Sequence, residues 1–139
     1  MKKEEFMCEA IKDAKKSKHH FGAVVVKGNK IIAHMGKRPA GDPRYHAETQ
    51  ALLNATNKLK TKTLKGCTLY STCEPCPMCF YMAWITGISK IIYGANINDA
   101  LKHGFKQINI SNQTLNKKSG NKIKLEKGFM RKECLELFN

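Results

Sequence analysis

Hydrophobic side chains recur at helical or at extended spacing through residues 1–60. Residues 3–17 carry apolar side chains three and four positions apart, which predicts an amphipathic helix. Two β-branched runs within residues 22–35 flank the tetrapeptide Lys-Gly-Asn-Lys, a pattern typical of a hairpin. Residues 37–45 are rich in proline and glycine and predict a loop, whereas residues 46–59 return to helical spacing. This part of the chain therefore predicts a helix, a hairpin and a second helix.

Strands and helices also alternate in the rest of the chain. Residues 67–72 and 89–94 are short apolar runs that predict buried strands. Between them, residues 75–87 predict a helix, because prolines occupy its first turn and a glycine ends it. Later segments predict a short helix, a strand, a mobile polar loop and a closing helix at residues 97–103, 106–110, 112–122 and 129–138, in that order. The whole pattern predicts one α/β domain over residues 1–139, with three α/β/α layers and a central five-stranded mixed sheet.

The chain is strongly basic. Its 139 residues, the length of one ordinary domain, carry a net charge of +14, and many of the lysines gather near the two ends. A basic surface attracts nucleic acid or anionic substrates through long-range electrostatics. No motif that interleaves basic with aromatic residues accompanies the charge, so a well-solvated lysine-rich surface is the simpler interpretation.

The sequence favours a cytoplasmic protein without a membrane partner. No apolar run approaches the roughly 18 residues that a membrane-spanning helix needs. Residues 1–20 are charged and lack the apolar core of a secretory signal. We therefore expect a reducing environment, in which clustered cysteines bind metal or take part in chemistry more often than they form disulfides.

Three of the six cysteines, Cys73, Cys76 and Cys79, are spaced three residues apart. An iron–sulfur cluster of the bacterial ferredoxin pattern would need a fourth cysteine where the chain has Ala83, unless a distant cysteine replaced it. A structural zinc site would need four protein ligands, which His46 could complete. A catalytic zinc site needs three protein ligands and keeps one position for water.

The catalytic arrangement agrees best with the predicted helices. Cys76 and Cys79 would share one side of a first helical turn, where the backbone amides and the helix dipole favour thiolates. His46 is the first residue of the helix predicted upstream, at residues 46–59, and would supply the third ligand. Glu48, two residues later, would lie beside the metal and could take and pass on protons.

These residues resemble the signature of the zinc-dependent nucleobase deaminases, members of the cytidine deaminase-like superfamily. That signature is His-x-Glu followed by Pro-Cys-x-x-Cys, and residues 46–48 and 75–79 match each fixed position. The stretches "FGAVVV" and "TLYSTCEPC" and the order of elements are also similar, over nearly the whole chain. The resemblance implies a cytidine deaminase-like fold.

For this chain, the resemblance implies one zinc ion held by His46, Cys76 and Cys79. The zinc would lower the pKa of a water molecule towards ~7, and Glu48 would carry protons to the ring and to the leaving amine. An exocyclic ring amine would become a carbonyl, with release of ammonia. Cys73 is implied not to be a ligand, and we expect its thiol to be buried.

Other residues have weaker assignments. Substrate contacts are implied for residues near the ligand motifs, namely Phe21, Ala23, Lys37, Ala47, Glu74 and Pro75. The thiols of Cys8, Cys67 and Cys134 are expected to be at least partly buried. Tyr81 and Trp84 could stack on a base, although a buried helix face is the simpler interpretation, and His20 could border the pocket.

Two subgroups resemble the chain, and neither matches at every position. Bacterial-type guanine deaminases are similar at "STCEPCPMC" and "IIYGANINDALKHGF", but Lys106 and Gln107 stand where they usually have acidic residues. tRNA-specific adenosine deaminases are similar at "DPRYHAE" and "KLEKGFMRKECLELF", but Tyr81 and Met82 are larger than is usual there. Both subgroups usually have an asparagine near the place of Lys37. We expect a free nucleobase as substrate, guanine first and then cytosine or a related aminated ring, with tRNA wobble adenosine as the alternative.

The resemblance also implies a homodimer whose pockets are completed by the neighbouring chain. An alternative from another class is a catalytically silent relative that binds nucleic acid. The intact Glu48 and the complete set of zinc ligands argue against that alternative.

Overall fold

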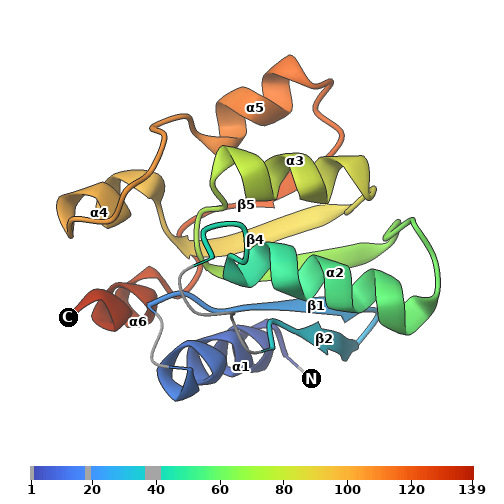
Figure 1. Ribbon diagram of the computed structural model, residues 1–139, viewed down its shortest axis with the longest axis horizontal. Helices are drawn as coiled ribbons and strands as arrows, with labels where there is room; N and C mark the ends of the chain where they lie inside the picture. The colour runs from blue at the N-terminus through green and yellow to red at the C-terminus, as the bar shows by residue number, and fades with distance from the viewer. Residues whose placement is uncertain (1, 18–19, 37–41) are drawn as a thin grey trace.

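A five-stranded mixed sheet forms the centre of the fold (Figure 1). A computed structural model describes residues 2–17, 20–36 and 42–139. The strands are β1 (Ala23–Lys27), β2 (Lys30–His34), β3 (Cys67–Cys73), β4 (Lys90–Ala95) and β5 (Lys124–Glu126). Their spatial order is β2-β1-β3-β4-β5; β1 is antiparallel to β2 and β3, whereas β4 is parallel to both of its neighbours. β3 therefore lies in the middle of the sheet, and its end leads directly into the cysteine cluster.

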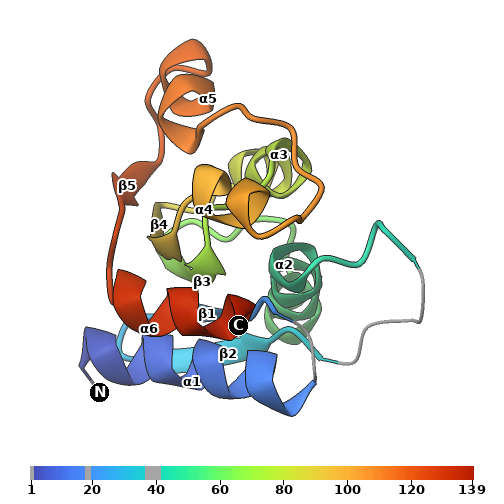
Figure 2. The same cartoon turned by 90° about the vertical axis from the view of Figure 1, so that its left-hand side faces the viewer.

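Helices cover both faces of this sheet (Figure 2). One face carries α2 (Ala47–Leu59), α3 (Pro77–Ile85) and α5 (Asn112–Lys118). The other face carries α1 (Lys3–Lys16) and α6 (Arg131–Leu135), followed by a 3₁₀ turn (Glu136–Phe138), while α4 (Ile97–Lys102) follows the end of β4. No helix of the described ranges is long and apolar enough to cross a membrane.

Alternating side chains of the strands build two hydrophobic cores, one on each face. Val25 of β1 belongs to the core under α2 and α3, and its neighbour Val24 belongs to the core under α1 and α6. Leu69 and Tyr70 divide β3 in the same way. The predicted α/β/α layering and the five-stranded mixed sheet are confirmed.

The predicted hairpin is also confirmed. Lys27 pairs with Lys30 across the turn between β1 and β2. Gly28 has a φ of 63°, a left-handed conformation that glycine adopts without steric cost.

The predicted strand at residues 106–110 is wrong. This segment forms no part of the sheet, and its alternating side chains Ile108 and Ile110 are exposed. The place beside β4 is taken by β5, where Ile91 pairs with Leu125. The alternation of apolar side chains at residues 106–110 resembles that of a strand, but β5 pairs with the free edge of β4 instead.

The polar loop predicted at residues 112–122 is also wrong, because α5 occupies most of it. The Ser111 hydroxyl accepts a backbone N–H from the first turn of α5 and caps the helix. Asn112 and Asn116 are buried and donate to backbone carbonyls of neighbouring segments. Buried hydrogen bonds, and not a broad apolar stripe, fix this helix to the rest of the fold. The spacing of hydrophobic residues therefore did not reveal it.

Two predictions of burial are wrong as well. Cys8 lies exposed on α1, whereas Cys67 and Cys134 are buried as expected. Tyr81 lies on the outer side of α3 with 58% of its surface exposed, and Trp84 beside it is half-buried.

Candidate functional site

Two helix starts bring the predicted metal ligands together. His46 is the N-cap residue of α2 and Cys76 is the N-cap residue of α3, and neither side chain caps its own helix. Pro77 occupies the first position of α3, where its fixed φ suits the helix and its missing N–H costs no hydrogen bond. The short turn from β3 into α3 thus holds the cysteines opposite the start of α2.

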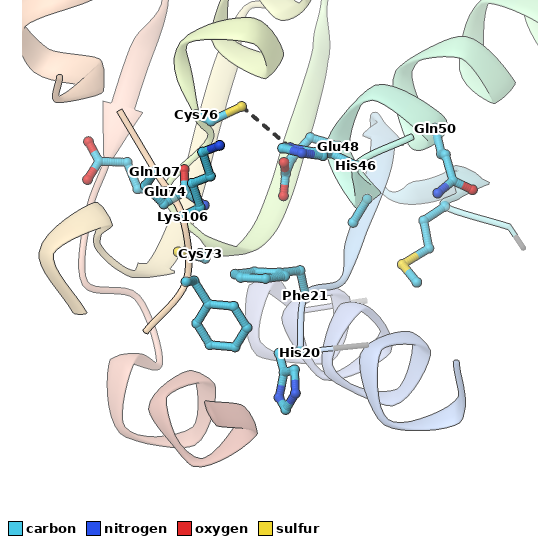
Figure 3. A pocket seen from close by; sticks show the side chains of 13 residues that line it. His20, Phe21, His46, Glu48, Gln50, Cys73, Glu74, Cys76, Lys106 and Gln107 are labelled. Atoms are coloured by element: carbon cyan, nitrogen blue, oxygen red, sulfur yellow. Dashed lines mark hydrogen bonds between the residues drawn. The ribbon is translucent and has the colours of Figure 1, made fainter. Parts of the chain in front are cut away.

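His46, Cys76 and Cys79 form a compact group of three metal-ligating side chains. The Cys76 Sγ lies 3.5 Å from the His46 Nδ1 and 3.5 Å from the Cys79 Sγ, and the Cys79 Sγ lies 3.6 Å from the His46 Nδ1. Figure 3 shows Cys76 and His46 facing one another. A tetrahedral zinc ion with Zn–S of about 2.3 Å and Zn–N of about 2.0 Å separates such ligand atoms by about 3.5–3.8 Å, so the group fits zinc.

The group contains three ligands and no more within the described part of the chain. A structural zinc site and an iron–sulfur cluster both need a fourth protein ligand. Cys73 does not join the group, and its Sγ instead lies 3.7 Å from the backbone oxygen of Asn96. The three-ligand set is the kind that leaves one metal position open.

The two thiols of the group shift each other's pKa in opposite directions. The hydrogen bond with Cys79 lowers the pKa of Cys76 to about 4, against the opposing effect of burial. The same bond, together with burial, raises the pKa of Cys79 well above its ordinary value. The lowered pKa of Cys76 favours the thiolate, which is the form that binds metal.

Glu48 lies beside this group, on the first turn of α2. Its side chain is 5% exposed, and its Oε1 accepts a hydrogen bond of 2.9 Å from the Ser71 hydroxyl. Burial raises the pKa of Glu48, and hydrogen bonds from Cys79 and Ser71 oppose that rise. A carboxyl group whose charged form is destabilised by burial is suited to accepting and releasing a proton.

A cavity of about 250 Å³ opens next to the metal-binding group and Glu48. Phe21 and Phe105 form part of its wall and pack edge to face, with ring centroids 5.0 Å apart. Gln50, Gln107 and Lys106 add amide and ammonium groups. The volume lies below that of pockets for drug-sized ligands, and the wall suits one flat heterocycle with polar edges.

Glu74 also lines this cavity, but both of its oxygens already have partners. Oε1 accepts the Ile97 N–H at 3.0 Å and Oε2 accepts the Asn112 N–H at 2.7 Å. The Tyr93 hydroxyl also hydrogen-bonds to Glu74. Glu74, which was predicted as a substrate contact, thus has a structural role that its sequence position did not reveal.

The other predicted substrate contacts fall in different places. Phe21 and Ala47 line the cavity. Ala23 and Pro75 are fully buried and are not among the residues that line it. Lys37 lies outside the described residues.

Several residues that line the cavity were not singled out as substrate contacts. His20 borders the cavity as suggested, and Cys73 is buried at its wall. Met35 and Gln50 carried no such expectation. The signal for Gln50 was its position one helical turn after His46, which places it on the same side of α2.

Comparison with known proteins identifies the family. Residues 1–95 match the family model of the cytidine and deoxycytidylate deaminase zinc-binding region. The chain belongs to this family. His46, Cys76 and Cys79 all fall within the matched residues of this deaminase-family chain, so the group that fits zinc lies in the zinc-binding region.

Two curated relatives carry different names. The tRNA-specific adenosine deaminase of Aquifex aeolicus is 42% identical over 101 residues, which are 68% of this chain and 67% of that protein. The guanine deaminase of Bacillus subtilis is 39% identical over 87 residues, which are 61% of this chain and 56% of that protein. The chain thus spans between about half and two thirds of the length of these relatives.

The deaminase-like fold extends beyond the matched region. A solved structure of the guanine deaminase from Nitrosomonas europaea superposes with a TM-score of 0.89, covering 99% of this chain and 82% of that chain at 23% identity. At this identity the likeness concerns the fold alone.

Proposed function

We propose that this chain is a zinc-dependent hydrolytic deaminase. Water and a ring amidine give ammonia and a ring carbonyl: the C–NH2 bond breaks and a C=O bond forms. The observation that carries the proposal is the position of Glu48, whose buried carboxyl group lies in a cavity directly beside His46, Cys76 and Cys79.

In this proposal, His46, Cys76 and Cys79 hold one zinc ion per chain. When bound, zinc supplies Lewis-acid activation of water near neutral pH. Glu48 takes the proton that the attacking water loses, and it delivers a proton first to the ring nitrogen beside the reacting carbon and then to the departing amine. One carboxyl group thus moves each proton, because its burial keeps bulk water from competing.

We propose a free nucleobase as substrate, with guanine tested first and cytosine or a related aminated ring next. The small cavity and the aromatic pair Phe21–Phe105 support a single flat ring system. The amides of Gln50 and Gln107 can both donate to and accept from the polar edge of a base. The relationship to a guanine deaminase supports the order of testing.

Deamination of wobble adenosine in tRNA is the second candidate. The relative from Aquifex aeolicus bears that activity in its name, and a net charge of +14 suits a polyanion. A salt titration of tRNA binding probes this charge, because each phosphate contact steepens the loss of affinity with salt.

Ammonia release from purified, zinc-loaded protein tests the proposal. The panel contains guanine, cytosine, adenine, cytidine, guanosine and tRNA, and we expect turnover of a free base. Turnover of tRNA alone would replace the first candidate by the second. Absence of ammonia with each compound would reject deamination and favour a silent relative.

We also propose that the chain forms a homodimer through α3. Met78, Tyr81 and Ile85 make an exposed apolar stripe on this helix, and such stripes mark interaction surfaces. The double variant Tyr81→Lys, Ile85→Glu is expected to sediment as a monomer. Ile108→Glu is the matched control, because Ile108 is equally exposed but lies elsewhere; a wild-type monomer would reject the proposal.

A cytoplasmic location completes the proposal. The site needs two cysteine sulfurs as metal ligands, and a reducing compartment keeps such thiols from forming disulfides. Fractionation of cells that express the tagged chain tests this location.

A further inference from the structure

Ser71 is buried on β3, directly across from the candidate catalytic carboxyl group. Its side chain has no exposed surface, and its hydroxyl lies 2.9 Å from the Glu48 Oε1 and 2.6 Å from the backbone oxygen of Cys73. A serine hydroxyl carries one proton, so it donates to one of these two acceptors at a time. The two contacts link the Glu48 carboxyl group through the Ser71 hydroxyl to the backbone of β3.

Ser71 belongs to β3, the central strand of the sheet. Ser71 pairs with Ala23 of β1 on one side and with Tyr93 of β4 on the other. Glu48, in contrast, reaches the cavity through a flexible side chain with three torsion angles. A donor on a central strand therefore restricts an otherwise mobile acceptor.

Few other donors can perform this task once metal is bound. The Cys79 thiol also hydrogen-bonds to Glu48, but a sulfur that ligates a metal is a thiolate and no longer donates. Within the described part of the chain, that leaves Ser71 as the side-chain donor recorded on Glu48. A buried carboxylate without a donor would be strongly destabilised or would turn elsewhere.

We propose that Ser71 is a positioning residue, which holds the Glu48 carboxyl group in the orientation needed for proton transfer. This inference rests on the proposed function, since it assigns how Glu48 is aimed. The serine itself neither touches the substrate nor ligates the metal. Displacement of a reacting group by about 1 Å can cost on the order of 100-fold in rate, so a single hydrogen bond at this place has a large effect.

The variants Ser71→Thr and Ser71→Val provide the matched test, because they have nearly the same shape and differ in the hydroxyl group. Steady-state kinetics are measured on the base that the zinc-loaded wild type deaminates. We expect kcat of Ser71→Val to fall about 10- to 100-fold with KM within about twofold of wild type. Ser71→Thr should keep kcat within a few-fold of wild type. Zinc content should stay at one per chain in both.

Thr72→Val controls for the loss of any buried hydroxyl on β3. The Thr72 Oγ1 accepts the Gly22 N–H at 3.0 Å, and Thr72 is not among the hydrogen-bond partners of Glu48 in the described part of the chain. We expect this variant to melt at a lower temperature while its kcat stays within about twofold of wild type. A fall in kcat as large as that of Ser71→Val would show a general structural effect and overturn the proposal.

Crystal structures of the zinc-loaded variants provide a readout that needs no substrate. The Glu48 carboxyl group should leave its position or take several conformations in Ser71→Val, and should stay within hydrogen-bond distance of the hydroxyl in Ser71→Thr. An unmoved Glu48 in Ser71→Val, or an unchanged kcat, would overturn the proposal. So would failure of both Ser71→Val and the smaller Ser71→Ala to fold. If wild type deaminates nothing on the panel, the proposed function fails, whereas the crystal structures still decide whether Ser71 positions Glu48.

Discussion

Glu48 and Glu74 lie at the same cavity and are equally buried, but their surroundings differ. Each is 5% exposed, and each lines the cavity beside the metal-binding group. Glu74 accepts two backbone N–H groups, one on each oxygen. Glu48 receives its hydrogen bonds from side chains, those of Ser71 and Cys79.

This difference separates a structural carboxylate from a chemical one. Backbone amides cannot turn away, so the two bonds to Glu74 fix the segments that donate them. The partners of Glu48 are the side chains of Ser71 and Cys79. No backbone N–H occupies its oxygens in the described part of the chain, so the carboxyl group can accept and release a proton. The number and kind of donors, more than burial, therefore distinguish the roles of the two residues.

Removal of zinc should have the largest effect on activity. It should stop the proton transfer by Glu48 and leave the hydrogen bonds of Glu74 unchanged. Without metal, the water near Glu48 is not activated, so ammonia release is expected to fall to background. Chelation, desalting and readdition of zinc measure this, with metal content determined in parallel. Cys76→Ser is expected to lose zinc and activity together, while circular dichroism shows that the fold remains. Full activity in metal-free protein would contradict the proposal.

Glu48→Gln should abolish proton transfer while keeping the site intact. The amide cannot carry the proton, so kcat is expected to fall about 100- to 10,000-fold. Zinc content and melting temperature should stay close to wild type, because the shape of the side chain is preserved. A variant with wild-type kcat would remove Glu48 from the mechanism.

Glu74→Gln should lower stability more than turnover, the opposite of Glu48→Gln. A glutamine offers one acceptor oxygen and turns its NH2 group towards the second backbone N–H, so one buried bond is lost. The free energy of unfolding is expected to fall by about 2 kcal/mol, as measured by urea denaturation. Residual activity per folded molecule should far exceed that of Glu48→Gln. Wild-type stability combined with lost turnover would instead make Glu74 a chemical residue.

Asp99 extends the comparison to a third buried carboxylate, whose main partner reaches into solvent. Burial opposes its charge, but the Arg131 guanidinium and the Asn96 N–H lower the pKa of Asp99 below its ordinary value. A lowered pKa in the folded state stabilises the fold above the unfolded value of about 3.9, and the gain is lost as pH falls through the folded value. Asp99→Asn should therefore cost about 1 kcal/mol at neutral pH.

The pH dependence is the sharper part of this test. Urea unfolding of wild type and Asp99→Asn should converge as the pH falls below about 4. A difference that persists at acid pH would show that packing, and not the charge of Asp99, separates the two proteins.

The metal-binding group could be predicted because its geometry is set locally. Prolines and N-cap positions fix where α2 and α3 begin, and spacing then fixes which side of each helix His46, Cys76 and Cys79 occupy. The role of Glu74 could not be predicted, because its two backbone partners lie 23 and 38 residues further along the chain. The contact between Ser71 and Glu48 could not be predicted either, since nothing in the sequence distinguishes this serine from any other small buried residue of a strand.

The region after β4 was predicted least well, for a related reason. The apolar alternation around Ile108 resembles that of a strand, but the edge of β4 pairs with β5. α5 lacks the apolar pattern of the earlier helices, and its buried asparagines find their partners through tertiary structure. Local patterns fail here because the stabilising contacts are distant in sequence.

The two bonds of Glu74 also have an evolutionary consequence. They tie both ends of the segment between Ile97 and Asn112 to one side chain, and this segment carries Phe105, Lys106 and Gln107 into the cavity. Because Glu74 fixes the ends of this segment and Asp99 fixes α4 within it, substitutions at Phe105, Lys106 and Gln107 are expected to alter the wall of the cavity without displacing the segment. Such substitutions would change which substrates the cavity accepts, while α2 and α3 keep the metal-binding group in place.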